Sequence, residues 1–450
     1  MNGRRTVVAA LASIGLLAAA CTAGGSSTSA VTSTPTVNPS ASHAPVTLTL
    51  WTFFTAREFD KFYGDTLKQL QAKYPWITLK AVPGKQQEDV LRAINSGTAP
   101  DIAMECCPDD SAKLCTTGAW IDLNPFLETE KIDIKSVVPA GALAYTGYQG
   151  TQCSLPVLTD AYGLYYNTDM FAKAGISGPP KTYSELLADA KKLTTYNPDG
   201  SIDVAGFNML PTGYEISNFE NGVWSDTQWY DGSGKSMLGS DPAWADMMRF
   251  QKQMIDAFGL DNLQKWYGAV GGPNSEFSPS NAFEQGKLAM SLDGEWRVAF
   301  IEDDKAKINY ATAPFPVADD MPELYGVGQI GGTIIGIPRD TPHQADAWDV
   351  VKFLALDTGA QEALGEALKN VPTVFPALKD PKLTSDQHFA TFLQIFANPH
   401  SRYKPVTPLA TGDVSLENQF IENYVTGKVS DLEAGLKDLA NRIDQQSQLG

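Results

Sequence analysis

Alternating strand and helix signals near the start of the chain most constrain its fold. β-Branched and aliphatic residues alternate in VTLTLWTFF, Val46 to Phe54, and predict a strand. A helical pattern runs from Arg57 to Tyr74, and the strand WITLKAV follows. A helix around Glu88 to Asn95 and a strand from Asp101 to Met104 come next. Strands separated by helices pair in parallel through right-handed crossovers, so we expect an α/β fold with a parallel sheet in this part.

The ends of these strands predict the position of a binding cleft. Ligands of open α/β sheets bind beyond the carboxyl ends of the strands. Trp51 to Thr55 and Glu105 lie where strands run out, and we therefore expect them at the cleft, with Trp51 and Phe54 as the ligand contacts of that range. The alternatives are a core aromatic at Trp51 and a solvated loop carboxylate at Glu105.

The stretch LPVLTDAYGLYYNTDMF, Leu155 to Phe171, carries further candidate ligand-binding residues. It predicts a strand, a turn at Thr159 and Asp160, and a second strand that crosses to the other half of the protein. A carboxylate accepts hydrogen bonds from hydroxyl groups, and an aromatic ring covers the apolar C–H side of a sugar. Asp160 and Tyr162 therefore suit a polyhydroxylated ligand. A buried tyrosine-rich strand with Asp160 as a turn residue is the alternative.

Two later segments place aromatic side chains beside polar ones. Trp224 and Trp229 lie in a segment without clear periodicity, and SPSNAFEQGKLAMSLDGEW ends in a loop that holds Asp293 and Trp296. Rings that stack on sugar faces, with carboxylates that bind hydroxyl groups, are typical of a carbohydrate site. Core packing of the same rings is the alternative. Arg402 and Tyr403, in a later loop, are further candidates for the cleft.

Gly331 and Gly332 precede the apolar strand Thr333 to Ile337. Because glycine has no Cβ, a backbone can approach a ligand closely at these positions. A plain turn is the alternative.

The beginning of the chain predicts export and anchoring. Arg4 and Arg5 precede an apolar run from Val7 to Ala20, which is too short to span a bilayer and has the layout of a secretory signal peptide. The small residues before Cys21 resemble a lipobox, in which the cysteine is lipidated, and an ordinary cleavage site is the alternative. Residues 22–45 are rich in Ser, Thr, Gly and Pro and predict a flexible tether.

Four cysteines follow Cys21, namely Cys106, Cys107, Cys115 and Cys153. An even number in an exported chain predicts two disulfides. We expect adjacent Cys106 and Cys107 to bond elsewhere, with Cys115 and Cys153 as partners in an order that the sequence does not specify. A thiolate metal site is the alternative, but the spacing lacks CxxC and the chain has 4 histidines. We expect no metal and no cofactor.

Length and charge bound the remaining choices. A chain of 450 residues is long enough for two sizeable lobes. Its net charge of −18 repels nucleic acid and anionic lipid surfaces, so general electrostatics favours neither as a partner. The charge does not identify the ligand, and we expect a monomer.

Five motifs in order resemble the extracellular solute-binding proteins of ABC importers, in the sugar-binding branch related to maltose-binding protein. The motifs are INSGTAPDIAM, GAWIDLNPFL, the stretch Leu155 to Leu193, SPSNAFEQGKLAMSLDGEW, and ATAPFPV with YGVGQIGGTIIGIPRDTPHQADAWDVVKFLAL. The resemblance implies the type II periplasmic-binding-protein fold, with two discontinuous α/β lobes around a ligand cleft and a hinge. Its expected lobes are residues 46–155 plus 322–370 and residues 156–321 plus 371–450.

The resemblance also implies a function. We expect a binding component, lipid-anchored to the outer face of the cell membrane, that captures an oligosaccharide or related polyol and delivers it to an ABC permease. In this family an aromatic residue after the fourth motif's strand commonly stacks on the ligand, which makes Trp296 the first candidate. The resemblance implies no enzyme activity. A polyamine, ferric ion or peptide ligand on the same fold, and an exported glycan-cleaving enzyme with two carboxylates facing one bond, are the alternatives.

Overall fold

The computed structural model describes residues 43–216, 221–409 and 411–447 of the chain. The predicted signal peptide, Cys21 and most of the predicted tether lie outside these ranges. Within the described ranges, every helix is too short or too polar to cross a membrane.

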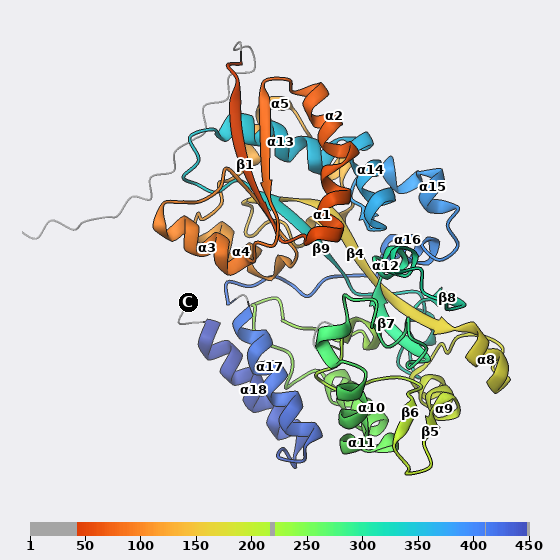
Figure 1. Ribbon diagram of the computed structural model, residues 1–450. Coiled ribbons are helices and arrows are strands. Elements are labelled where there is room, and N and C mark those ends of the chain that lie inside the picture. Colours follow the sequence, from red (N-terminus) through yellow and green to blue (C-terminus); the bar gives the residue numbers. More distant parts are fainter. Residues whose placement is uncertain (1–42, 217–220, 410, 448–450) are drawn as a thin grey trace, which may run out of the picture. The chain divides into compact units, whose positions relative to one another are not determined.

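One mixed sheet organises the described chain (Figure 1). Its strands are ordered β10-β4-β9-β3-β1-β2, and β7 and β8 also pair with β4. A separate two-stranded sheet holds β5 and β6. The strands are β1 (Val46–Thr52), β2 (Ile77–Val82), β3 (Ile102–Glu105), β4 (Ser154–Asn167), β5 (Thr195–Tyr196), β6 (Ile202–Val204), β7 (Met290–Gly294), β8 (Tyr310–Ala313), β9 (Ile330–Gly336) and β10 (Val371–Pro372).

The alternating signals at the start of the chain form the parallel part of this sheet. β1 pairs in parallel with both β2 and β3, as predicted. Leu48 and Leu50 of β1 are fully buried. β9 is antiparallel to β3, so the chain returns to this part of the sheet late in the sequence.

The predicted helix from Arg57 to Tyr74 is two helices, α1 (Ala56–Tyr63) and α2 (Asp65–Lys73). Gly64 separates them with ψ near −103°, outside the helical range. Glycine adopts non-helical backbone conformations at little steric cost and has a low helix propensity, so the helix breaks at this position.

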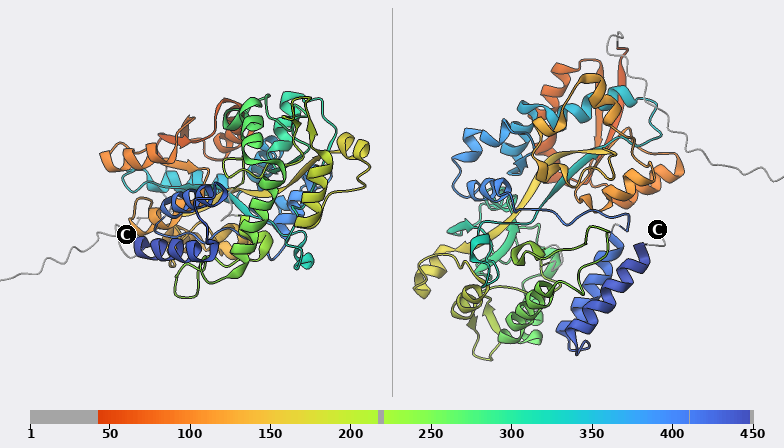
Figure 2. Two further views of the ribbon diagram at one scale, coloured as in Figure 1. Left: turned by 90° about the horizontal axis from the view of Figure 1, so that it is seen from below. Right: turned by 180° about the vertical axis from the view of Figure 1, so that it is seen from behind.

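Other helices lie beside the strands, whereas α17 and α18 at the end of the chain pack on each other and on α10 (Figures 1 and 2). Two of the helices begin at a side-chain cap. Asp241 accepts a hydrogen bond from the backbone N–H of Ala243 at the start of α10, and Thr182 accepts one from Glu185 at the start of α9. The α-helices are α3 (Gln87–Ser96), α4 (Ser111–Thr116), α5 (Asn124–Glu130), α6 (Ile134–Val137), α7 (Ala140–Leu143), α8 (Thr168–Ala174), α9 (Tyr183–Leu193), α10 (Pro242–Phe258), α11 (Leu260–Ala269), α12 (Arg297–Asp304), α13 (Gln344–Leu356), α14 (Thr358–Leu368), α15 (Pro381–Thr384), α16 (Ala390–Ala397), α17 (Thr411–Val425) and α18 (Leu432–Ser447). The 3₁₀-helices are η1 (Pro108–Asp110), η2 (Asn221–Ser225), η3 (Gly272–Ser275), η4 (Pro322–Leu324) and η5 (Ala377–Lys379).

β4 joins two parts of the sheet (yellow in Figures 1 and 2). Residues 154–161 pair with β9, and residues 162–166 pair with β7. The predicted turn at Thr159 and Asp160 is absent, because both residues pair with glycines of β9 and the strand runs on for 14 residues. The crossing that the sequence predicts for this stretch is therefore made by one continuous strand.

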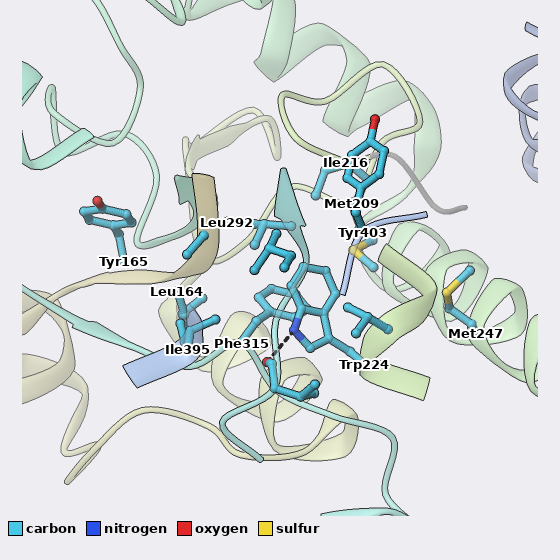
Figure 3. Packing of buried hydrophobic residues seen from close by; sticks show 14 of the residues in the cluster. Leu164, Tyr165, Met209, Ile216, Trp224, Met247, Leu292, Phe315, Ile395 and Tyr403 are labelled. Carbon is cyan, nitrogen blue, oxygen red and sulfur yellow. Dashed lines mark hydrogen bonds between the residues drawn. The ribbon is translucent and has the colours of Figure 1, made fainter. Parts of the chain in front are cut away.

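Two clusters of buried apolar side chains form the core of the described chain. One joins Leu48 and Leu50 to Trp348 of α13. The other includes Leu292 of β7 and Phe315 (Figure 3). Burial of a side chain of this size contributes roughly 1.5–3 kcal/mol relative to its exposure to water.

One disulfide joins Cys115 of α4 to Cys153, just before β4, with the two Cα atoms 5.3 Å apart. This pairing corrects the expectation that Cys115 and Cys153 bond to Cys106 and Cys107. The sulfur atoms of Cys106 and Cys107 instead lie 2.7 Å from each other.

Candidate functional site

A cavity of about 570 Å³ lies where β4 crosses between the two parts of the sheet. This volume falls within the range of small-molecule binding sites, roughly 300–1,000 Å³. The walls come from the loops after β1 and β3, from β4 and β9, from α1 and α12, and from the segment near Tyr403.

Part of the predicted site lines this cavity. The lining residues that the sequence singled out as ligand contacts are Phe54, Asp160, Tyr162, Trp296, Gly331 and Gly332. They come from the loop after β1, from β4, from the loop after β7, and from β9. The topology therefore brings together side chains that are far apart in the sequence.

Trp296 is positioned by its neighbours at the end of β7. Its ring meets the ring of Tyr162 edge-on, with centroids 5.5 Å apart, and its indole N–H donates to the Tyr214 hydroxyl at 3.1 Å. A Cβ on Gly294 would lie 2.1 Å from the Trp296 ring. Glycine at this position therefore allows the ring to lie against the backbone of β7.

Other aromatic side chains extend this surface. Phe53 and Phe54, in the loop after β1, have ring centroids 4.5 Å apart. Phe277 lines the cavity with 61% of its surface exposed, and it packs edge-on against Phe300 of α12 at 6.0 Å. An exposed phenylalanine at a cavity is a surface for apolar contact with a ligand.

A polar cluster lies beside the aromatic surface. Asn370 donates through Nδ2 to Asp160 Oδ1 at 3.1 Å and to Glu295 Oε1 at 2.8 Å. The backbone N–H of Ala161 donates to the other Glu295 oxygen at 2.7 Å. Asp160 and Asn370 line the cavity, whereas the Glu295 side chain is fully buried behind them.

Burial governs the charges of this pair. It raises the pKa of Asp160 to about 7, although the hydrogen bond from Asn370 opposes the shift. Burial, followed by the proximity of Asp160, raises the pKa of Glu295 well above its ordinary value. Of these two carboxyl groups only Asp160 lines the cavity, so Asp160 is the one that can present negative charge to a ligand.

The two glycines of β9 have different surroundings. A Cβ on Gly331 would meet the Tyr403 ring and Asp160 at ordinary contact distances of 3.7 to 3.9 Å. A Cβ on Gly332, where φ is +139°, would lie 2.3 Å from the carbonyl oxygen of Leu158. Both line the cavity, but close approach of β4 to β9 accounts for Gly332.

Ion pairs link α1 to α12 at the cavity. Arg57 contacts Asp304 at 2.6 Å, and Lys61 contacts Asp303 at 2.6 Å. The Arg57 guanidinium also lies over the Phe300 ring, 5.0 Å from its centroid. These contacts connect residues more than 240 positions apart.

Two predicted tryptophans lie in the core. Trp224 is buried against Phe315, and its indole N–H donates to the carbonyl oxygen of Val327 at 3.1 Å (Figure 3). Trp229 is buried edge-on to Trp244 under the Arg402 guanidinium. Both rings are occupied by protein contacts, and neither lines the cavity.

Three further predicted residues also lie outside the cavity lining. Asp293 is buried and accepts from Arg297 Nε at 2.6 Å, so it holds the start of α12. The Glu105 side chain points into the protein with 2% of its surface exposed, and burial raises its pKa well above the ordinary value. Trp51 packs under the Lys85 ammonium, 4.6 Å from the ring centroid.

Of three further cavity residues, Asn370 was not predicted from sequence, whereas Tyr403 and Phe53 lie in segments expected at the cleft. Asn370 follows α14, where the sequence shows no pattern that predicts a ligand contact. Only the fold brings Asn370 to Asp160. Tyr403 donates to Asp109 at 2.6 Å from a loop late in the chain. Phe53 belongs to the range Trp51 to Thr55 that the sequence predicted at the cleft, and it lines the cavity.

Among the described residues, no group of three or more His, Cys, Asp or Glu side chains is arranged to hold a metal ion.

Comparisons with known proteins place this geometry in a family. Residues 57–361, more than half of the chain, match the family described as bacterial extracellular solute-binding protein. A putative binding protein of Brucella abortus is 27% identical over 301 residues, which cover 66% of this chain and 68% of that relative.

Solved structures share the fold. CpMnBP1 with mannotriose bound has a TM-score of 0.77 and 25% identity, covering 88% of this chain and 99% of that one. The maltose/maltodextrin-binding domain MalE from Bdellovibrio bacteriovorus, bound to maltotriose, has a TM-score of 0.70 at 18% identity, covering 90% and 100% of the two chains. The chain has the type II periplasmic-binding-protein fold, two discontinuous α/β lobes around a ligand cleft, and this prediction from sequence is confirmed.

Proposed function

We propose that this chain, which belongs to the bacterial extracellular solute-binding protein family, captures a short oligosaccharide and delivers it to the permease of an ABC importer. The observation that carries the proposal is one cavity that holds aromatic rings beside a carboxyl–amide cluster. Trp296 and Tyr162 cover C–H faces of the sugar, and Asp160 with Asn370 binds its hydroxyl groups.

A structural likeness and the size of the cavity support a sugar as the ligand. The solved structures of similar fold include proteins with mannotriose and maltotriose bound. The cavity volume of about 570 Å³ suits a ligand of that class better than a single ion.

Capture works by domain closure. We propose residues 46–155 plus 322–370 and residues 156–321 plus 371–450 as the two lobes, with β4 among the segments that join them. A ligand that contacts both walls binds the closed state better than the open state, and so shifts the population towards closure. The loaded closed form is the one that docks on the permease.

The position in the cell is part of the same proposal. Cys21 carries a lipid that holds the exported monomer at the outer face of the membrane, and residues 22–45 tether the binding lobes. Cys21 and residues 22–42 lie outside the described ranges, and the lipobox-like residues of the sequence support the anchor.

We propose no catalytic role for the carboxyl pair. A glycan-cleaving enzyme needs two carboxyl groups on either side of the scissile bond. Glu295 shares the amide of Asn370 with Asp160 and is fully buried, so it does not face a substrate.

A thermal-shift screen of the exported protein tests the ligand class. The panel contains mono- and oligosaccharides, spermidine, amino acids, peptides and ferric citrate, with product analysis of each hit. A ligand that binds the folded state raises the midpoint with the logarithm of its excess over Kd. We expect intact oligosaccharides to raise it. A midpoint shift with spermidine or iron alone would contradict a carbohydrate ligand. Cleavage of the sugar would contradict a binding protein without catalytic activity.

A further inference from the structure

Two adjacent cysteines form part of the cavity wall. Cys106 and Cys107 follow the last residue of β3 and lead into η1. Both side chains line the cavity, Cys106 partly buried and Cys107 exposed. Their sulfur atoms lie 2.7 Å apart, close enough for a reaction between them.

The sheet places this pair beside the aromatic part of the wall. β1 and β3 are parallel neighbours, with Thr52 opposite Met104. The chain after β1, with Phe53 and Phe54, and the chain after β3, with the two cysteines, therefore leave the sheet at the same edge. Sulfur is polarizable and packs favourably against aromatic and apolar groups.

We propose that Cys106 and Cys107 are a redox modification site: they close a vicinal disulfide, and the oxidised pair is part of the surface that binds the sugar. The pair replaces two thiol groups by a rigid ring of eight atoms without S–H donors. Such a surface suits the apolar C–H face of a saccharide. The second half of this inference rests on the proposed function, whereas the first half does not.

The reaction balances as thiol–disulfide exchange. Each cysteine loses one hydrogen, and one sulfur–sulfur bond forms between Cys106 and Cys107. Two electrons and two protons pass to a small-molecule disulfide or to an exported disulfide oxidoreductase, whose own sulfur–sulfur bond is cleaved to two thiols. Members of an extracellular family work where disulfides persist.

The bond is expected to be more easily reduced than the other disulfide of the chain. Adjacent Cα atoms lie about 3.8 Å apart, closer than the roughly 4.4–6.8 Å usual for disulfides, and such rings are strained. Cys115 and Cys153 have Cα atoms 5.3 Å apart and are buried. Mild reductant therefore opens the cavity pair and spares the buried one.

Peptide mapping tests the disulfide without any ligand. The exported protein is incubated with oxidised glutathione, denatured, alkylated without reductant and digested. We expect the peptide that holds Cys106 and Cys107 to be unalkylated and lighter than the dithiol by two hydrogen atoms. Alkylation of both cysteines, or a mixed disulfide with glutathione on either, would overturn the proposal.

Calorimetry with mannotriose and maltotriose tests the binding surface. Mild reductant should weaken binding by wild-type protein about three- to tenfold. The Cys106→Ser, Cys107→Ser variant should bind like the reduced protein and ignore reductant, with its thermal midpoint confirming that it folds. Equal affinity of the oxidised and reduced wild-type protein would show that the disulfide does not contribute to sugar binding. If neither the oxidised nor the reduced protein binds any sugar, the proposed function fails, and so does the proposed role of the disulfide in sugar binding. Peptide mapping still decides whether the disulfide forms.

Discussion

Trp296 is held at the cavity by contacts within the protein, so its ring is in place before a ligand arrives. The edge-on contact with Tyr162 and the hydrogen bond to Tyr214 fix it. Preorganised aromatic side chains lose little conformational entropy on binding and carry much of the binding free energy in well-packed sites.

Trp296→Ala should therefore weaken oligosaccharide binding by about 2 kcal/mol, or roughly 30-fold in Kd. Trp296→Phe keeps a ring and should lose less. Calorimetry measures both, and the thermal midpoint of each unliganded variant shows that it is folded. A Trp296→Ala variant that binds as tightly as wild type would remove this residue from the binding surface.

The charge of Asp160 makes a prediction about pH. A sugar hydroxyl donates to the ionised carboxyl group, so ligand binding favours the charged form. Because the pKa of unliganded Asp160 is raised to about 7, the affinity should fall as the pH is lowered from about 8 to about 6. Titrations at several pH values, at constant ionic strength, measure this change.

Asp160→Asn is the matched control. It should bind sugar more weakly than wild type at pH 8 and lose most of the pH dependence. Because the pKa of Asp160 is higher in the folded protein than in the unfolded chain, the ionised carboxyl group destabilises the fold at pH 8. The Asp160→Asn variant should therefore not lower the thermal midpoint of the unliganded protein at pH 8. An unchanged pH dependence would assign the titration to another group.

For single residues, the sequence predicted which residue types the site contains better than it predicted where their side chains point. The end of β1 predicted Phe54 because alternation marks where a strand stops. Trp224 and Asp293 were expected at the cleft, but the Trp224 ring packs on Phe315 and Asp293 binds Arg297. Only tertiary packing decides where such side chains point.

Among the elements, β4 connects the two parts of the sheet at the site. It supplies Asp160 and Tyr162, and it pairs with β9 on one side of the crossing and with β7 on the other. The sequence predicted the crossing and its polar and aromatic residues. It predicted a turn as well, because Thr159 and Asp160 are common turn residues, and the pairing with β9 overrides that preference.

The ion pairs between α1 and α12 predict that sugar binding depends on salt concentration. Arg57 and Lys61 pair with Asp304 and Asp303 at the cavity, and partly exposed pairs of this kind contribute about 0.2–1 kcal/mol each. Salt should weaken sugar binding by wild-type protein, because it screens contacts that hold the two walls together. The Arg57→Gln, Lys61→Gln variant should bind more weakly at low salt and respond less to added salt.

Lys68→Gln provides the comparison. It removes an exposed pair with Asp65 inside α2, away from the cavity lining. Its sugar affinity and salt dependence should match those of wild type. Equal salt dependence in the α1 variant and in Lys68→Gln would show that the pairs between α1 and α12 do not contribute to capture.

For the whole molecule, the order of motifs predicted the family and the fold, and both are confirmed. Each motif marks one strand or loop that the fold needs, so five in order exclude most other α/β arrangements. The pairing of Cys115 with Cys153 did not follow from sequence, because pairing depends on which sulfur atoms the fold brings together.

The proposed anchor makes a prediction about location. Cys21→Ser removes the sulfur that would carry the lipid, so the exported protein should leave the membrane fraction and appear in the soluble one. Fractionation followed by immunoblotting measures the distribution. Membrane retention of the variant would contradict anchoring through Cys21.

The central claim is that the cavity binds an intact carbohydrate. Isothermal titration of the exported protein with mannotriose, maltotriose and spermidine, with chromatography of the sugar afterwards, tests it most directly. We predict saturable binding of one uncleaved oligosaccharide per protein, lost or strongly weakened in Trp296→Ala. Binding of spermidine alone, or cleavage of the sugar during the titration, would contradict the claim.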